Sequence, residues 1–278
     1  MIEALFNYTF LQNALIAGLL IGLLAPLIGT FVIVKKLSFI ADTLSHVSLA
    51  GIALGLLLQS NAVVTFPPVY MGTIFAVLGS ILLELLRTQF MAYKEVVMPV
   101  ILSLGVALSV IFVSAGNGFN AEILGYLFGS INTVSTEDVK LLALITILIV
   151  SLVILNYRTL LAISFNEQNA KLIGINVRRF SFIFIIILSI VISLSIKIMG
   201  TLLISSLMII PVTSSMKVAK SFKQTLILSI VFSELAVVLG LVGSYYFNIP
   251  SGAMIVLFNV IILFSVLIYN YIEGVIKK

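Results

Sequence analysis

Residues 11–34 read LQNALIAGLLIGLLAPLIGTFVIV, and they belong to a run of 31 residues without a charged side chain that separates Glu3 from Lys35. A helix needs about 20 such residues to cross the roughly 30 Å hydrocarbon core of a bilayer. The stretch is therefore long enough for a membrane span. Two further runs without Asp, Glu, Lys or Arg follow, 41 residues between Asp42 and Glu84 and 38 between Glu234 and Glu273.

The composition of the whole chain extends this inference. Of its 278 residues 62% are hydrophobic and 9% are charged, whereas about 25% are charged in a typical soluble domain. We expect an all-α polytopic membrane protein, because a transmembrane barrel needs alternating segments of about 10 residues. The chain has no Cys and one His, which excludes disulfides, thiolate metal sites and a multi-histidine cage within one chain.

The basic residues predict the topology. Thirteen of the fifteen Lys and Arg fall into five groups: Lys35–Lys36, Arg87 and Lys94, Arg158 to Arg179, Lys217 to Lys223, and Lys277–Lys278. If all five are cytoplasmic, residues 1–278 form one transmembrane domain of about nine helices, or eight if 198–216 does not cross. The N-terminus is then outside and the C-terminus cytoplasmic. Because the net charge of +5 lies at span ends, we expect no nucleic-acid partner.

The predicted spans share this alternation between apolar runs and basic groups. They are about 11–34, 37–59, 67–87, 96–115 and 139–157, two closely joined spans between Arg179 and Lys217 that break near Gly200, and two between Lys223 and Lys277. Two connections are too long for simple turns. The extracellular one, 116–138, contains a short apolar helix from Ile123 to Ile131. The cytoplasmic one, 157–179, contains a short helix that Gly174 ends.

Three ionisable residues lie well inside the predicted spans: Asp42, His46 and Glu234. At about 1.5 Å per residue from Lys36, Asp42 lies roughly 9 Å and His46 roughly 15 Å into the bilayer. Their i, i+4 spacing puts both on one helix face, where a carboxylate and an imidazole offer two ligands to zinc or manganese. The alternative is that the pair only satisfies its own polarity. Glu234 is a further candidate ligand, with structural packing as its alternative.

Two other charges inside or near the spans have simpler interpretations. Glu84 lies three residues before Arg87 and is expected to form an interfacial salt bridge with it. Lys197 lies near an outer span end, from which its side chain can reach the surface. Neither residue is therefore predicted to belong to the metal path.

The chain carries no ATP-binding motif and no soluble catalytic domain. A GxxxxGK[ST] phosphate loop is excluded because the dipeptide Gly-Lys does not occur. We therefore expect that the chain is not an enzyme and that any coupling to ATP must come from a partner. The loop 157–179 is where such a partner would dock, and its alternative interpretation is an ordinary solvated connector.

Residues 36–53, KLSFIADTLSHVSLAGIA, resemble a segment of the bacterial ABC-transporter permeases for zinc and manganese. Four further segments resemble the same family in the same order: Leu127 to Ser130 in the external helix, Phe165 to Asn176 in the coupling loop, Met199 to Pro211 in a late helix pair, and Tyr246 to Gly252 in the last external turn. Asn166 departs from the pattern, which has an acidic residue there.

The resemblance implies a type II importer permease: two copies around a pore, two ATPase subunits, and an extracellular metal-binding receptor protein. It places the chain in a bacterial inner or plasma membrane. It implies that Asp42 and His46 line the pore and that Glu167, Ala170 and Gly174 belong to the ATPase-docking surface. No cofactor is expected to stay bound, since the metal is cargo. The form of residues 43–49 is closer to zinc-type members than to manganese-type ones.

Two alternatives to a zinc or manganese importer stay open. One is a permease of the same architecture for iron chelates or a cobalamin-like cofactor, in which Asp42 and His46 would be structural. The other is a stand-alone proton-coupled metal carrier that uses Asp42, His46 and Glu234 as a relay. Competition between a chelate and the free ion distinguishes the first alternative from a zinc or manganese importer. Transport without ATP or partners distinguishes the second.

Overall fold

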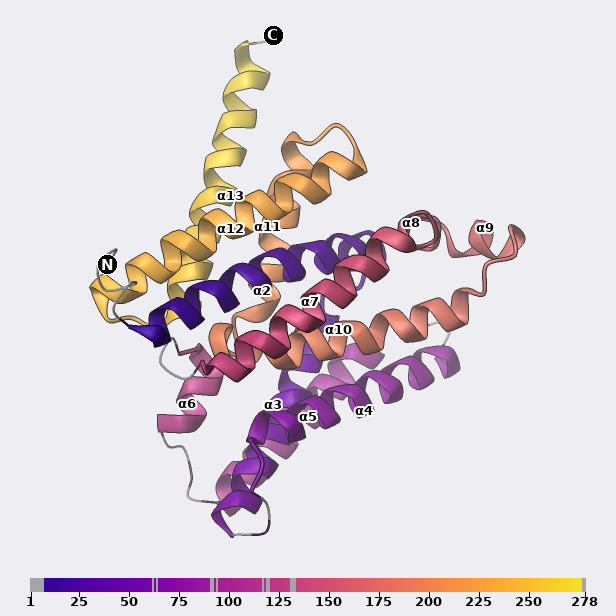
Figure 1. Ribbon diagram of the computed structural model, residues 1–278. Coiled ribbons are helices and arrows are strands. Elements are labelled where there is room, and N and C mark those ends of the chain that lie inside the picture. The colour runs from indigo at the N-terminus through magenta and orange to yellow at the C-terminus, as the bar shows by residue number, and fades with distance from the viewer. Residues whose placement is uncertain are drawn as a thin grey trace.

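The computed structural model describes residues 8–61, 63, 65–90, 93, 95–116, 118, 121–130 and 134–276, within which helices are the regular elements (Figure 1). Eight helices of this described part are long and apolar enough to cross a membrane. They are α2 (Thr9–Val34), α3 (Ile40–Ser60), α4 (Pro68–Gln89), α5 (Val97–Ala115), α7 (Thr136–Leu155), α10 (Val177–Met199), α12 (Phe222–Phe247) and α13 (Ser251–Ile276). The shorter helices are α6 (Ala121–Phe128), α8 (Tyr157–Phe165), α9 (Glu167–Leu172) and α11 (Ile204–Val218).

The predicted ninth span is shorter than expected. α11 has 15 residues and is about 22 Å long at 1.5 Å per residue. It packs against α2, α12 and α13, and most of its side chains are buried. Because neighbouring helices rather than lipid surround it, this segment needs neither the length nor the uniform apolarity of a lipid-exposed span. The other eight predicted spans are confirmed to within a few residues.

Both predicted connecting helices are also present. α6 occupies the long connection before α7, and α9 ends just before Gly174, which has a positive φ of 84°. The predicted end of the outer helix, Ile131, lies outside the described residues, as do Glu3, Lys94, Lys277 and Lys278.

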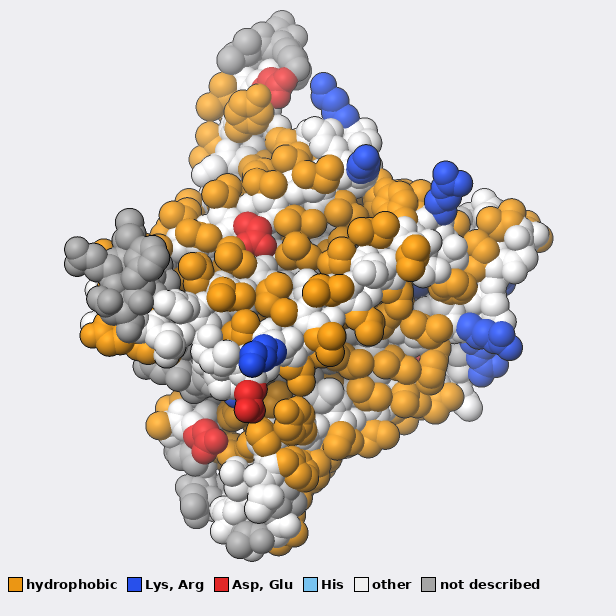
Figure 2. Space-filling view, viewed as in Figure 1, with side chains coloured by type: hydrophobic (Ala, Val, Ile, Leu, Met, Phe, Trp, Pro, Cys, Tyr) orange, Lys and Arg blue, Asp and Glu red, His pale blue; other side chains and the backbone are white. Residues whose placement is uncertain are grey.

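The helices form two groups joined by α2 and α10. α3, α4 and α5 pack together on one side, and α11, α12 and α13 pack together on the other (Figure 1). α2 contacts α12, α11 and α7, and α10 contacts α4 and α3. Basic side chains gather where α8, the start of α10 and the connection before α12 lie, and acidic ones near α6 (Figure 2). We call the end that carries Lys35, Arg87 and Arg178 the basic end.

The break between α10 and α11 is fixed by contacts to α6 and α13. Gly200 ends α10 with a φ of 78°, and a side chain there would collide with the backbone of α6. The Thr201 N–H donates to the Tyr126 carbonyl at 2.9 Å, and the Ser251 hydroxyl donates to the Ile198 carbonyl at 3.0 Å. Since only glycine combines this φ with this close approach, the sequence turns here and returns as α11.

Candidate functional site

Asp42 and His46 lie on the partly exposed face of α3, which we call its open face. Every residue of α3 from 40 to 53 is buried except these two, which are half-buried. α4, α5 and α10 cover the other sides of α3. The two side chains lie one helical turn apart and so leave the helix on the same face. The predicted pairing on one face is therefore confirmed, and this face is the one that the chain leaves uncovered.

A glycine of α5 lets the two helices meet at the backbone of the site. A Cβ built on Gly105 would lie 2.8 Å from the Val47 backbone nitrogen and 3.0 Å from the His46 carbonyl carbon. Those distances are shorter than real carbon contacts allow, so no larger residue fits without moving α3. Gly105 therefore fixes how close His46 stands to α5.

Hydroxyl groups fix α3 against two further helices. The Ser48 hydroxyl donates to Ser193 Oγ of α10 at 3.1 Å, and Ser193 Oγ lies 2.8 Å from Thr73 Oγ1 of α4. On the α5 side, the Thr43 hydroxyl lies 3.4 Å from the Met98 carbonyl. Buried hydroxyls that satisfy one another specify one arrangement of the helices. They set the rotation of α3 and with it the direction in which Asp42 and His46 project.

The two site side chains make no hydrogen bond or ion pair with the part of the chain that the structure describes. The nearby Ser45 hydroxyl donates to the backbone carbonyl of Asp42 at 2.9 Å and not to its carboxylate. The described residues contain no group of three or more His, Cys, Asp or Glu that could hold a metal ion. One chain thus contributes two potential ligands, and a full metal shell needs further ones.

Glu234 lies in another part of the molecule. It is half-buried on α12, which packs chiefly against α13, α2 and α11. A Cβ on Gly22 of α2 would lie 3.3 Å from its carboxyl group, and its Oε2 atom is buried without a hydrogen-bond partner. The fold does not gather Glu234 with Asp42 and His46 into one cluster.

The predicted coupling residues lie on and beside α9. Glu167 and Gly174 are exposed, whereas Ala170 is fully buried in a small cluster with Ile163 and Val177. Ala170 therefore attaches α9 to the body of the protein and does not itself form the surface. Three large apolar side chains of this region are strongly exposed: Phe165 at 64%, Leu172 at 84% and Ile173 at 71%.

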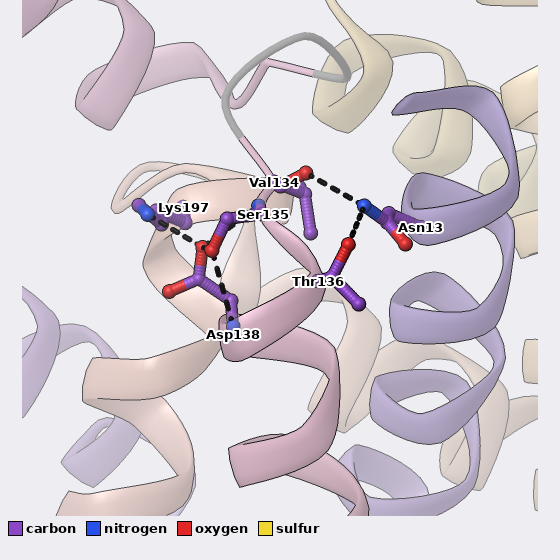
Figure 3. Close-up of polar contacts among 6 residues, drawn as sticks. All are labelled: Asn13, Val134, Ser135, Thr136, Asp138 and Lys197. Carbon is purple, nitrogen blue, oxygen red and sulfur yellow. Dashed lines mark hydrogen bonds and ion pairs between the residues drawn. The ribbon is translucent and has the colours of Figure 1, made fainter. Parts of the chain in front are cut away.

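The contacts of the remaining charges differ in how far the sequence predicted them. The predicted salt bridge is confirmed, with Arg87 Nη1 3.3 Å from Glu84 Oε2. Lys197 keeps a partly exposed side chain near the outer end of α10, and the sequence did not predict that its Nζ pairs with Asp138 Oδ2 at 2.7 Å (Figure 3). Ser135 completes this group, since Asp138 Oδ2 also accepts from its N–H at 2.9 Å and its hydroxyl at 2.7 Å.

The Lys197–Asp138 pair belongs to a larger group of polar contacts between α2, α7 and α10. The Asn13 amide nitrogen lies 3.2 Å from Thr136 Oγ1 and 3.4 Å from the Val134 carbonyl (Figure 3). Residues 135–138 form a capping box at the start of α7, a pattern that is recognisable in sequence as Ser-x-x-Asp. The partner Lys197 is 59 residues away, and no local pattern indicates it.

Comparison with known proteins supplies the family. The model of the ABC 3 transport family matches residues 7–270. A probable metal transport system membrane protein of Treponema pallidum is 34% identical over 95% of this chain and 96% of its own length. The manganese import system permease ScaB of Streptococcus gordonii is 30% identical (94% and 91%), and the high-affinity zinc uptake membrane protein ZnuB of Haemophilus influenzae is 28% identical (90% and 94%).

A solved structure agrees with the sequence comparisons. PsaBC from Streptococcus pneumoniae, determined in complex with a Fab, contains a chain that matches with a TM-score of 0.83 and 28% identity, covering 95% of this chain and 93% of that one. Family model, relatives and fold thus coincide over nearly the whole length. The chain belongs to the ABC 3 transport family, as the membrane permease of a type II ABC importer and not as its ATPase.

Proposed function

We propose that this permease imports a divalent transition metal along a path lined by Asp42 and His46. The observation that carries the proposal is the packing of α3, which is buried from 40 to 53 except at these two side chains. Neither has a hydrogen-bond partner among the described residues, so that part of the chain leaves both groups available to a ligand. Ionisable groups in a membrane span are expensive and mark transport pathways.

A second copy of the chain would complete the ligand set. Each copy offers one carboxylate and one imidazole. A two-fold axis beside the open face of α3 would bring four such groups together. Four ligands of this kind are enough for zinc. A site formed by two copies can also open when they move apart, which allows the ion to leave. Membership of an ABC transport family argues against the stand-alone proton-coupled carrier.

We propose zinc as the cargo and manganese as the second candidate. Imidazole ligands favour zinc, and carboxylates suit manganese, while the named relatives include both zinc and manganese systems. The test is uptake of radiolabelled zinc and manganese into proteoliposomes that contain the chain, its ATPase and its receptor. ATP-dependent zinc uptake supports the proposal, and uptake of manganese alone changes the metal. If a metal chelate moves and neither free ion does, the metal path through Asp42 and His46 is wrong.

We further propose that the ATPase docks on two exposed apolar side chains, Leu172 at the end of α9 and Ile173 directly after it. These residues lie outside the candidate spans, where water disfavours large exposed apolar groups unless a partner covers them. Replacing Ile173 by Asp should abolish co-purification of the ATPase. The matched control is Val63→Asp, because Val63 is 67% exposed between α3 and α4, at the other end of α3. Equal loss in both variants would contradict the docking site.

The proposed orientation places the basic end in the cytoplasm and α6 outside, where the metal-binding receptor would dock. The positive-inside rule supports this assignment. The absence of Cys allows one thiol to be introduced at a time. A membrane-impermeant thiol reagent added to spheroplasts should label Ser60→Cys, which lies at the end of α3, and should not label Gln168→Cys on α9. The opposite pattern would invert the topology.

A further inference from the structure

A cavity of about 190 Å³ lies at the basic end, apart from the proposed metal path. It is enclosed by the ends of α2 and α4, the start of α10, and α9. Six of the side chains that line it are charged: Lys35, Glu84, Arg87, Glu167, Lys171 and Arg178. Four basic and two acidic groups leave a surplus of two positive charges. Because Glu84 pairs with Arg87, Glu167 is the one remaining acidic group that faces the other three cations.

Two of the cationic groups have hydrogen-bonding capacity that the described chain does not use. The buried Nε–H of Arg87 has no acceptor. The Lys35 ammonium donates to Ser181 Oγ at 3.2 Å and lies 5.3 Å from the centre of the Phe184 ring. No carboxylate oxygen of the described residues lies within ion-pair distance of it. A partly buried cation with unused donors is unfavourable, so an anion in the cavity would stabilise the Lys35 ammonium by accepting from it, and its negative charge would favour the nearby Arg87 guanidinium.

Burial lowers the pKa of Lys35, while the negative charges of Glu167 and Glu84 act to raise it and the positive charge of Arg87 lowers it further. Partial burial thus disfavours the charged form of Lys35, and the two carboxylates compensate for this effect only in part. An additional negative group beside Lys35 would hold it in the charged form. The electrostatics therefore agree with the geometry of the unused donors.

The level of the cavity along the spans indicates where the anion comes from. Lys35 directly follows the span α2, Arg87 lies in the last turn of α4, and Arg178 lies in the first turn of α10. The ends of three spans meet there, at the depth of lipid headgroups. Basic pockets between span ends recognise anionic headgroups. We propose that this cavity binds the phosphate of an anionic lipid such as phosphatidylglycerol.

An occupied cavity would connect the lipid to the proposed ATPase-docking region. α9 supplies Glu167 and Lys171, while the other charged groups belong to the ends of α2, α4 and α10. A phosphate bound among these groups would stabilise the packing of α9 against the ends of the spans. Anionic lipid should therefore strengthen the mechanical link between the connection 157–179 and the membrane domain.

The test measures lipid preference of the full-length chain by native mass spectrometry. The protein is released from vesicles of four parts phosphatidylcholine to one part phosphatidylglycerol. The variant Lys171→Gln/Arg178→Gln removes two exposed charges that line the cavity, so folding should be unaffected. The control Arg179→Gln/Lys223→Gln removes two exposed charges that do not line it. At about fivefold per charge, the preference for phosphatidylglycerol should fall about 25-fold in the first variant and little in the control.

Four results would overturn the proposal, the last of them loss of the bound lipid when the ATPase is added. The first is an equal loss of lipid preference in both variants, which would indicate general surface charge. The second is an unchanged preference in the cavity variant. The third is displacement of the bound lipid by millimolar inorganic phosphate, which would assign the cavity to free phosphate. Retention of phosphatidylglycerol after the ATPase is added supports the lipid assignment, and its loss would assign the cavity to the partner.

Discussion

Two spans of this protein carry ionisable groups, and their positions and surroundings differ: Asp42 and His46 lie in the first two turns of α3, whereas Glu234 lies near the middle of α12. On α3, Asp42 and His46 are the half-buried residues of a stretch that is otherwise buried from 40 to 53. On α12, Glu234 has exposed apolar neighbours, Val231 and Leu235 among them, and lies against Gly22 of α2. An intramembrane charge alone does not distinguish a transport path from packing. What distinguishes α3 is that three helices fix it and leave open only the face with a carboxylate and an imidazole.

The largest expected effect separates the two spans directly. Asp42→Ala/His46→Ala removes both of the proposed ligands from each chain, so ATP-dependent metal uptake should fall by about 100-fold or more, beyond the usual effect of losing an outer-shell partner. The measurement is initial uptake into proteoliposomes at matched protein content. Uptake that stays at the wild-type level would remove Asp42 and His46 from the path.

The next effect tests whether the packing of α3 matters. In Gly105→Ala the new methyl group meets the Val47 nitrogen at 2.8 Å, so α3 must shift, at about 1–3 kcal/mol for overpacking. Uptake should fall together with thermal stability. Gly125→Ala in α6 is the matched control, because its nearest contact would be 3.9 Å. If the two variants behave alike, the close contact with α5 does not position the site.

A smaller effect is expected at the ion pair between α7 and α10. Lys197→Gln removes the cation from Asp138 and should lower stability by about 1 kcal/mol, because the pair is partly exposed and solvent screens it. Thermal denaturation in detergent measures this loss. Lys140→Gln is the control on the same face of the membrane, since Lys140 is exposed. A similar drop in the control would show that the ion pair contributes little.

The smallest effect is expected at Glu234. Glu234→Gln keeps the shape of the side chain, and the buried Oε2 has no hydrogen-bond partner to lose. Stability should not fall, because the amide replaces a carboxylate whose buried Oε2 lacks a partner, and uptake should stay near that of the wild type. A strong loss of uptake with normal stability would make α12 a second pathway helix and remove the contrast with α3.

The sequence predicted those features that depend on local pattern. Apolar runs placed eight spans, and the i, i+4 spacing placed Asp42 and His46 on one face. It did not predict that this face would be the open one, since that depends on Gly105 and Ser193 from distant helices. Lys197–Asp138 likewise joins residues 59 apart. α11 was expected to span because hydropathy does not reveal whether lipid or protein surrounds a helix.

The most direct test of the central claim is cross-linking between two copies of the permease. Because the chain has no Cys, His46→Cys and Glu234→Cys each carry a single thiol. In native membranes, His46→Cys should be cross-linked into dimers by a short bifunctional thiol reagent, and Glu234→Cys should stay monomeric. Dimers from Glu234→Cys with none from His46→Cys would place the two-fold axis beside α12 and contradict a metal path built by α3 from both copies.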